Sequence, residues 1–412
     1  MPKPALLTGI TSVRNRGVEA LVATIAVELR RRRPDLSIAV LGRGSDQDVP
    51  RLDALGVRFV AVAKPGSWIS QPHPIGQIAG RPGRAGGSGD KPKRPLHGVI
   101  NGASVVIASG GDPFSLHYGS VESHLRPVRV AIDAGIPAIF LGQSIGPFAN
   151  RSDERLWARV AGRARLITVR EPISYDYLTA ELGLPVSLVH ETADPAFLLE
   201  PSPPASIGEL RRRAGIDGDG PIIALAPSQA IARHAGVDEE RHLRAWSSAI
   251  RMIVEEIPAR VLLVPHVQGT GVGSDDTLIT RELQARAGDD RRVSVAGAMT
   301  AAELKGLIGG CELLVAERMH AAIAGLSGGV PTLTVGYSRK AEGIMRQVLG
   351  TQMGRSLVIP IEQFVDQGCA VEAICSAWTL RHEIRETLEG RLPAVRQMAA
   401  RNFDLLAEVI PG

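Results

Sequence analysis

The alternation of short apolar runs with segments of helical periodicity most constrains the fold of this chain. Runs such as residues 5–8 and 222–226 are each followed by a segment in which apolar residues recur every three or four positions. Parallel strands need a crossover connection, which a helix usually supplies, so the alternation predicts parallel sheets covered by helices. We therefore expect an α/β fold.

The predicted strands form two series separated by a proline cluster at residues 201–204. The first comprises residues 5–8, 37–41, 58–62, 104–108, 138–141, 166–169 and 186–189, and the second residues 222–226, 261–264, 293–295, 313–316 and 332–335. A chain of 412 residues is too long for one ordinary core. We expect two Rossmann-like, doubly wound domains facing each other across a cleft, at residues 1–200 and 205–371. We expect residues 372–412 to be mostly helical and to pack back on the first domain.

A segment rich in Gly, Pro and Arg at residues 64–98 interrupts the first series. Its composition cannot bury enough apolar surface to offset the conformational entropy lost on ordering. The segment is either a passive surface insertion, which proteins tolerate well, or a basic lid over a bound ligand.

Composition argues against several classes of protein. Aromatic residues make up 4% of the chain and the net charge is only +4, so we expect no nucleic-acid partner. Three irregularly spaced cysteines and ten scattered histidines favour neither a disulfide framework nor a metal site. Dinucleotide and Walker fingerprints are missing, and we expect no cofactor. No apolar run suggests a transmembrane segment or signal peptide, so we expect a cytoplasmic protein and leave open a peripheral position at the inner face of the membrane.

The strongest chemical signal lies late in the second series. Arg318 and His320 occupy the turn between a predicted strand and a helix at residues 320–327, and Gly336 and Lys340 follow the next strand. Both turns should lie at the carboxyl edge of a parallel sheet, where ligands bind. Two cations and an imidazole suit a small, highly charged substrate that needs proton transfer. Singly, the same residues are equally compatible with a helix cap, a buried His and a solvated Lys.

Turns after other predicted strands should reach the same region. Arg170 and His266 each follow a strand and are candidates to face the cleft. The turn at residues 9–17 either offers backbone N–H groups with Arg14 and Asn15 to an anion, or contains only structural glycines. Further loop candidates for contact with the substrate are Gly110, Gly111, Asp112 and Gln143.

Two patterns allow competing interpretations. The G-x-S-x-G sequence at residues 142–146 suggests a hydrolase, but the residues after it do not open the helix that a nucleophile elbow needs. Asp194, Asp275 and Asp276 could supply acids to the site, and helix capping explains them equally well.

Taken in order, these segments resemble the polysaccharide pyruvyltransferase family. The resemblance covers most of the chain and rests on residues 15–21, 109–112, 142–148, 170 with 174, 193–197, 265–267, 274–276, 318–320, 329–331 and 337 with 340. It implies a GT-B-like fold and transfer of pyruvate from phosphoenolpyruvate to a sugar diol, which forms a cyclic ketal and releases phosphate. The acceptor would belong to a polysaccharide, glycolipid or glycoside, with a lipid-linked unit among the open choices.

The resemblance also implies roles for the candidate residues. His320, Arg170 and Lys340 fall on catalytic positions, and we expect Arg318, Gly336 and His266 to help Arg170 and Lys340 bind the donor. Two alternatives remain. One is a GT-B glycosyltransferase that uses a nucleotide-sugar. The other is an inactive glycan-binding homologue, because the family usually has an acidic residue where Val18 stands.

Overall fold

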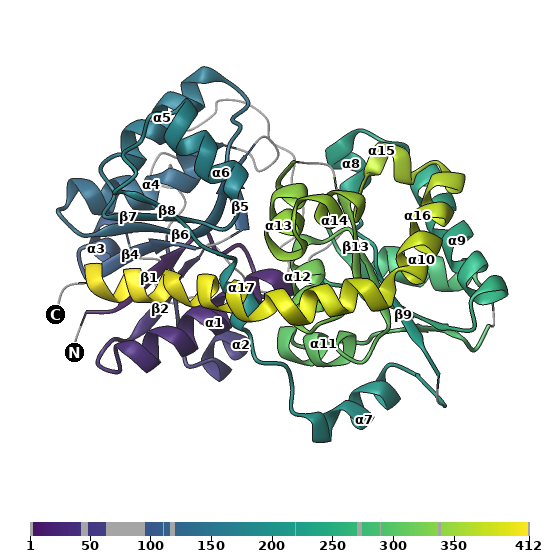
Figure 1. Ribbon diagram of the computed structural model, residues 1–412. Helices are drawn as coiled ribbons and strands as arrows, with labels where there is room; N and C mark the ends of the chain where they lie inside the picture. Colours follow the sequence, from purple (N-terminus) through teal and green to yellow (C-terminus); the bar gives the residue numbers. More distant parts are fainter. Residues whose placement is uncertain are drawn as a thin grey trace, which may run out of the picture.

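The computed structural model contains two parallel β-sheets, each covered by helices (Figure 1). It describes residues 3–42, 48–62, 95–109, 111–115, 120–218, 220–269, 274–288, 290–336 and 339–410. The predicted α/β class with two Rossmann-like domains is confirmed. The segment at residues 64–98 lies outside the described residues up to residue 94, and its last residues begin helix α3 (Leu96–Ile100).

The first sheet has the doubly wound order in which the chain reverses direction beside its first strand. Its main path is β3 (Arg58–Ala61), β2 (Ile38–Gly42), β1 (Ala5–Thr8), β4 (Val105–Ala108), β6 (Ala138–Ile145), β7 (Leu166–Val169) and β8 (Val189–Glu191). A further strand, β5 (Gly111–Phe114), pairs with β6, and the strand pairs of this sheet are parallel. The order reverses between β1 and β4, which places a crevice at the carboxyl ends of these strands.

The second sheet repeats this topology. Its order is β11 (Val293–Val295), β10 (Arg260–Leu263), β9 (Ile222–Ala226), β12 (Leu313–Ala316), β13 (Thr332–Gly336) and β14 (Val358–Pro360), and its strand pairs are parallel. Its switch point lies between β9 and β12. The carboxyl ends of both sheets therefore supply the turns that carry the candidate residues.

Helices cover both faces of each sheet (Figure 1). In the first part of the chain they are α1 (Arg16–Arg32), α2 (Val49–Ala54), α3, α4 (Val121–Asp133), α5 (Arg151–Ala161), α6 (Pro172–Asp176), the π-helix η2 (Tyr177–Glu181) and the 3₁₀-helix η3 (Pro195–Leu198). The rest are α7 (Pro204–Arg213), α8 (Ile231–Ala235), α9 (Glu239–Glu256), α10 (Asp276–Arg286), α11 (Ala301–Ile308), α12 (Met319–Ser327), α13 (Arg339–Leu349), α14 (Thr351–Ser356), α15 (Ile361–Phe364), α16 (Gln367–Thr379) and α17 (Arg381–Val409).

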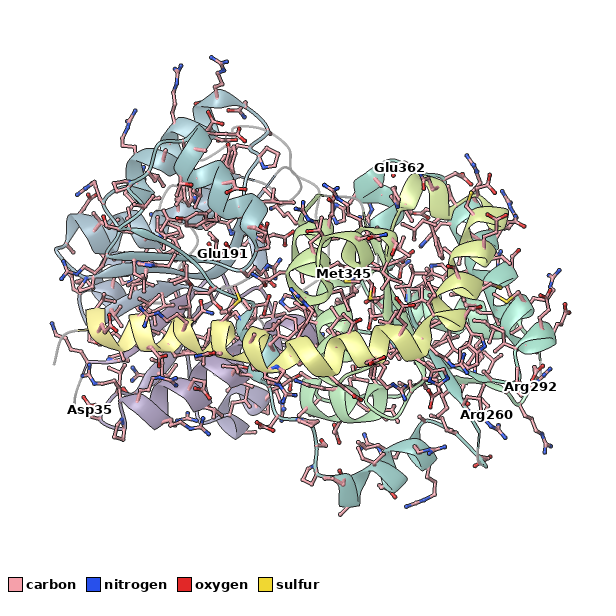
Figure 2. All side chains as sticks on the ribbon, in the orientation of Figure 1. Asp35, Glu191, Arg260, Arg292, Met345 and Glu362 are labelled. Atoms are coloured by element: carbon pink, nitrogen blue, oxygen red, sulfur yellow. The ribbon has the colours of Figure 1, made fainter. Side chains whose placement is uncertain are left out.

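The continuous apolar runs are explained by burial on both faces. Along β12, Leu313 and Val315 pack into one hydrophobic cluster while Leu314 and Ala316 pack into another on the opposite face. Successive side chains of a strand point to opposite faces, so a strand covered on both sides needs apolar residues throughout. Figure 2 shows charged side chains such as Arg292 at the periphery and Met345 inside the second domain.

Two strand predictions were wrong in extent by more than one residue, and two strands were missed. The strand predicted at residues 186–189 begins only at Val189, because residues 186–188 form a turn. β6 continues to Ile145, through the sequence that was predicted to be a turn. β5 and β14 were not predicted as strands at all.

Helix α17 lies along both domains, from the end of the second to the far side of the first (Figure 1). Its first half contributes Ile384 and Leu388 to the core that includes the second sheet, and its last turns place Phe403 and Leu406 beneath the first sheet. Buried Asn402 accepts a hydrogen bond from Thr168 Oγ1 at 2.5 Å and donates to the carbonyl of Ala193 at 2.8 Å. Across the described part of the chain, no helix has the length and apolarity required to cross a membrane.

Candidate active site

A cavity of about 380 Å³ lies between the domains, at the carboxyl ends of both sheets. Its lining includes eight of the residues singled out in the sequence: Asn15, Asp112, Arg170, His266, Arg318, His320, Gly336 and Lys340. They arrive from the ends of different strands, as the topology of two parallel sheets requires. Half of the remaining lining comes from helix α8 and the connection that precedes it: Ser228, Ala230, Ile231, Arg233 and His234.

Arg170 directly follows β7 and is almost completely buried, with 2% of its surface exposed. Its Nη1 donates to Oδ2 of Asp194 at 2.6 Å, and its Nε donates to Oγ of Ser144 at 2.8 Å. These two bonds fix the plane of the guanidinium group, so the fork is preorganised before any ligand arrives.

His320 lies in the first turn of α12, where it contacts the first domain on two sides. Its Nε2 is 3.6 Å from Oδ2 of Asp194, and its ring fills the space beside Gly17 at the start of α1. Its side chain is 15% exposed, which leaves part of the imidazole open to the cavity. A group able to exchange a proton is thus held where residues from both domains meet.

Asp194 is fully buried, and its Oδ1 caps η3 by accepting the backbone N–H of Ala196 at 2.8 Å. Although burial opposes ionisation, the neighbouring His320 and Arg170 hold the pKa of Asp194 well below its usual range. The carboxylate therefore stays charged at any working pH. Capping, one of the two roles considered from the sequence, accounts for only one of its oxygens.

Arg318 is the N-cap residue of α12, and its guanidinium group is bound by the buried carboxylate of Asp276. Its Nε and Nη2 donate to the two carboxylate oxygens of Asp276 at 3.0 and 2.7 Å, and Nη2 also donates to the carbonyl of Ser274 at 3.2 Å. Asp276 is fully buried and also accepts the backbone N–H groups of Gln229 and Val267. Neighbouring Asp275 caps α10.

Lys340, in the first turn of α13, brings a buried cation to the cavity. It is 7% exposed, and among the described residues its Nζ has no hydrogen-bond partner. Burial, opposed in part by Asp112, lowers the pKa of Lys340 to about 8. A buried ammonium group that lacks a partner is a natural ligand for an anion.

His266 forms part of a backbone contact that joins the domains. Its carbonyl accepts the N–H of Arg16 at 3.0 Å, and the N–H of Gln268 donates to the carbonyl of Arg14 at 3.1 Å. Burial, reinforced by the charge of nearby His320, holds the pKa of His266 well below its usual range. His266 is therefore neutral at physiological pH, and it can serve the site as a hydrogen-bonding group rather than as a cation.

Three further candidates among the described residues do not line the cavity. Gln143 is buried in β6 and donates from Nε2 to the carbonyl of Ser109 at 2.6 Å, and Arg14 donates to the carbonyl of Gly269 outside the cavity. Gly111 belongs to β5 without lining the cavity, and Gly110 lies outside the described residues.

The hydrolase interpretation of residues 142–146 fails. Ser144 is a strand residue of β6, not the residue of a sharp strand-to-helix turn, and its hydroxyl is fully buried and accepts a bond from Arg170.

One buried network was missed by sequence reasoning. Oε1 of Glu317 lies 2.6 Å from Nε2 of His242 and accepts the indole N–H of Trp246 at 2.9 Å, while Oε2 accepts the N–H of Ser228 at 2.6 Å. Although burial opposes protonation, Glu317 raises the pKa of His242 above its usual value. Through the bond to Ser228, the network fixes one wall of the cavity. Its only signal in the sequence was a carboxylate directly before Arg318.

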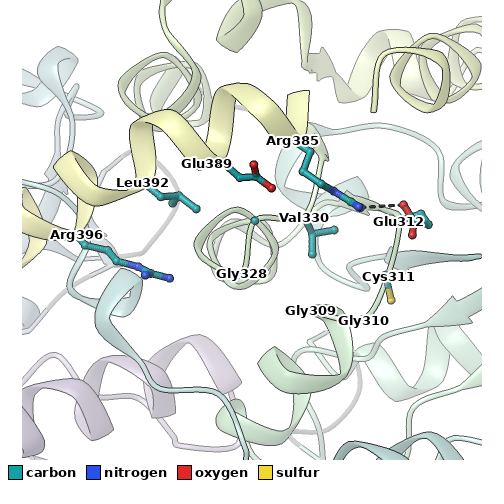
Figure 3. A pocket seen from close by; sticks show the side chains of 11 residues that line it. Gly309, Gly310, Cys311, Glu312, Gly328, Val330, Arg385, Glu389, Leu392 and Arg396 are labelled. Carbon is teal, nitrogen blue, oxygen red and sulfur yellow. Dashed lines mark hydrogen bonds and ion pairs between the residues drawn. The ribbon is translucent and has the colours of Figure 1, made fainter. Parts of the chain in front are cut away.

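A second pocket, of about 510 Å³, lies at the amino edge of the second sheet (Figure 3). Its lining contains the turns that lead into β12 and β13 and side chains of α17 such as Arg385 and Arg396. Arg385 pairs with Glu312 at 2.8 Å, and Arg396 donates to the carbonyl of Ser327 at 2.9 Å. Because this pocket lies at the edge opposite to the strand ends where ligands bind, the interdomain cavity is the better candidate for the substrate site.

Comparison with known proteins extends these observations. A family model described as polysaccharide pyruvyl transferase matches residues 15–339. The amylovoran biosynthesis protein AmsJ of Erwinia amylovora is 26% identical over 263 residues, which are 59% of this chain and 59% of AmsJ. The chain therefore matches less than two thirds of the length of that curated relative.

Solved structures share the architecture at low identity. The UDP-GlcNAc 2-epimerase from Neisseria meningitidis bound to UDP-GlcNAc has a TM-score of 0.60 at 9% identity, covering 98% of this chain and 100% of that one. A glycosyltransferase from Rickettsia africae ESF-5 has a TM-score of 0.57 at 10% identity, covering 100% of both chains. At such identities the likeness shows the fold alone, and it confirms the expected GT-B-like arrangement.

The family match covers most of the chain. It begins at Asn15, the first residue of the cavity lining, and reaches residue 339, so that only Lys340 and Ala341 of that lining lie beyond it. The chain therefore belongs to the polysaccharide pyruvyl transferase family.

Proposed function

We propose that this protein transfers pyruvate from phosphoenolpyruvate to two hydroxyl groups of a sugar in a polysaccharide or its precursor, forming a cyclic ketal and releasing phosphate. One observation carries the proposal: Arg170, Arg318 and Lys340 line a single cavity together with His320. Phosphoenolpyruvate bears a carboxylate and a phosphate on a small carbon frame, and three cations at fixed positions suit both groups.

The cations differ in a way that fits such a donor. Arg170 and Arg318 are each held by a buried carboxylate, Asp194 or Asp276, which fixes their geometry and offsets part of their charge. Lys340 Nζ has no hydrogen-bond partner among the described residues and contributes a compact charge. The two arginines would orient the donor through directed hydrogen bonds, and Lys340 would stabilise the phosphate as it leaves.

His320 would supply the proton transfers. In the first step it gives a proton to the methylene carbon of phosphoenolpyruvate, which becomes a methyl group and leaves an oxocarbenium-like centre at the adjacent carbon. A sugar hydroxyl attacks that carbon and returns its proton to His320. The bond from the same carbon to the phosphate oxygen then breaks, and the second hydroxyl closes the ketal while its proton passes to the released phosphate. General acid–base catalysis of this kind contributes about 10²–10⁴-fold to a rate.

The test measures transfer directly. Purified protein is incubated with phosphoenolpyruvate and a panel of vicinal and 4,6-diol glycans, and both phosphate release and the new ketal methyl signal in proton NMR are recorded. We expect acceptor-dependent phosphate release in equal amount to ketal. His320→Ala should reduce turnover by about 10²-fold or more while donor binding persists. His382→Ala, at an exposed position of α17, is the matched control.

Nucleotide-sugars are the control donors, because the structural likeness includes a protein bound to UDP-GlcNAc. Release of UDP from a UDP-sugar, without consumption of phosphoenolpyruvate under any acceptor, would overturn the proposal in favour of a glycosyltransferase. Glycan binding without turnover of either donor would favour an inactive homologue.

A further inference from the structure

We propose that Asp194 is a positioning residue that assembles the active site across the domain interface, by holding Arg170 of the first domain and His320 of the second on one carboxylate oxygen. This inference rests on the proposed function. It adds a positioning role for Asp194 that the identification of the donor does not require. It predicts that turnover depends on the charge of a residue that does not itself line the cavity.

The two carboxylate oxygens of Asp194 contact different groups, which supports a role for this residue beyond helix capping. Oδ1 of Asp194 caps η3 through Ala196, whereas Oδ2 lies 2.6 Å from Nη1 of Arg170 and 3.6 Å from Nε2 of His320. A cap needs only one oxygen. The second oxygen is therefore directed at the two groups that the mechanism uses.

His320 has little else to fix its orientation. Its Nε2 is buried and makes no hydrogen bond with the part of the chain that the structure describes. On its other side the ring meets the backbone of Gly17. The imidazole is thus placed by steric contact with α1 and by the charge of Asp194, both of which belong to the first domain, while the residue itself belongs to α12 of the second.

The surrounding charges make the carboxylate necessary. His320 must carry an extra proton before it protonates the donor, yet the guanidinium groups of Arg170 and Arg318 face the same cavity and repel a further cation. His266 is also close to His320 and supplies no negative charge. Asp276 offsets part of the charge of Arg318, and Asp112 and Glu317 also line the cavity. Asp194 is the buried carboxylate whose oxygen lies 3.6 Å from Nε2 of His320, in a site where electrostatic interactions are only weakly screened.

The position of Asp194 in the fold lets it join the domains. It begins η3, which contacts α1 of the first domain, α12 of the second and the bridging helix α17. Phe197 and Ala196 of η3 belong to the hydrophobic cluster that also contains Leu21 of α1 and Ile323 of α12. A rigid segment packed between both domains can hold a carboxylate at a defined place relative to each.

The experiment is a double-mutant comparison with two readouts. Asp194→Asn keeps the size of the side chain and removes its charge. We expect its kcat to fall at least about tenfold, bounded by the roughly 10²–10⁴-fold that the imidazole itself supplies. Binding of phosphoenolpyruvate should stay equal or become tighter, because Ser144 still orients Arg170 and a negative charge has been removed. In the His320→Ala background, Asp194→Asn should change kcat by less than about threefold.

Asp366→Asn is the matched control, because Asp366 caps α16 through the same i to i+2 bond, to Gly368 N at 3.0 Å, and is not part of the cavity lining. Equal loss of rate in wild-type and His320→Ala backgrounds, or a loss of donor binding in step with kcat, would reduce Asp194 to a structural residue. Should Asp194→Asn not fold, Asp194→Glu retains the charge but shifts it by one methylene, and we again expect kcat to fall while donor binding persists.

A readout independent of turnover separates this inference from the proposed function. The imidazole ¹⁵N signals of His320, assigned by their loss in His320→Ala, should move in Asp194→Asn and stay in place in Asp366→Asn. Unmoved signals would overturn the inference even in an active enzyme. Wild-type protein that consumes no phosphoenolpyruvate would overturn the proposed function, whatever the spectra show.

Discussion

Gly17 and His320 touch across the domain interface, with the imidazole ring in the space that any side chain at residue 17 would need. A Cβ atom placed on Gly17 would stand 2.5 Å from Cγ and 2.6 Å from Cβ of His320. The backbone of Gly17 is not in the left-handed region, so the conformation does not call for glycine and the close approach does. The start of α1 and the proton-transfer residue therefore constrain each other.

Gly17→Ala should lower turnover more than it lowers donor affinity, because the added methyl group displaces His320 while Arg170, Arg318 and Lys340 stay in place. Overpacking of this kind costs about 1–3 kcal/mol of stability. Steady-state kinetics and thermal unfolding give the two quantities. Gly208→Ala is the control, because Gly208 lies in α7 with no atom within 4 Å of the added Cβ, and it should be neutral or slightly stabilising. Unchanged kcat in Gly17→Ala would show that His320 tolerates displacement.

The sequence predicted that the candidate residues meet at one site. It did not predict the ion pairs and hydrogen bonds that hold these residues in place. Arg170, His266, Arg318 and Lys340 were expected together because residues that follow parallel strands meet at one edge. The pairing of Asp194 with His320, in contrast, depends on how two domains dock, and no periodicity within either domain carries that information.

Strand prediction succeeded where a buried apolar run contained no typical turn residues. The buried run of β9 was placed at its observed residues, whereas β5 was mistaken for a turn because Gly111, Asp112 and Pro113 are typical turn residues. The predicted strand ended at residue 141, because the Gly-rich sequence that follows is typical of a turn, yet β6 continues through Gly142 even though this glycine has a positive φ. Tertiary pairing with β5 and β7 overrides local preference in this segment.

Donor affinity should depend on pH through Lys340, whose pKa is lowered to about 8. An anion binds the protonated amine. Below pH 8 that form already dominates, whereas above it the amine must take up a proton on binding, so affinity should weaken by up to about tenfold per pH unit. Calorimetric titration with phosphoenolpyruvate between pH 7 and 9.5, in buffers of different ionisation enthalpy, measures both the affinity and the proton uptake.

Lys340→Met should bind more weakly and lose this pH dependence. Lys305→Met is a close control, because burial also lowers the pKa of Lys305 to about 8, but its Nζ donates to the carbonyl of Leu199 away from the cavity. A pH dependence that survives in Lys340→Met, or disappears in Lys305→Met, would contradict the assignment.

The buried pair of Asp276 and Arg318 should matter far more to stability than an exposed pair of the same geometry. Asp276→Asn breaks a bidentate contact and should cost about 3–5 kcal/mol, because it leaves a half-buried guanidinium group without its carboxylate. Asp290 forms a comparable bidentate contact with exposed Arg292, and Asp290→Asn should cost only about 0–1 kcal/mol. Urea unfolding of both variants gives the difference, and equal costs would argue against an ordered Arg318 in the site.

The central claim is that the interdomain cavity binds phosphoenolpyruvate through its cations. The most direct measurement is calorimetric titration of wild-type protein and Arg318→Ala with phosphoenolpyruvate, and with UDP-sugars as competing ligands. We predict saturable binding of phosphoenolpyruvate to wild type that is at least about tenfold weaker in Arg318→Ala, as expected for loss of a charge-assisted contact of about 1.4 kcal/mol or more. Binding that Arg318→Ala leaves unchanged, or binding of a UDP-sugar in place of phosphoenolpyruvate, would contradict the account.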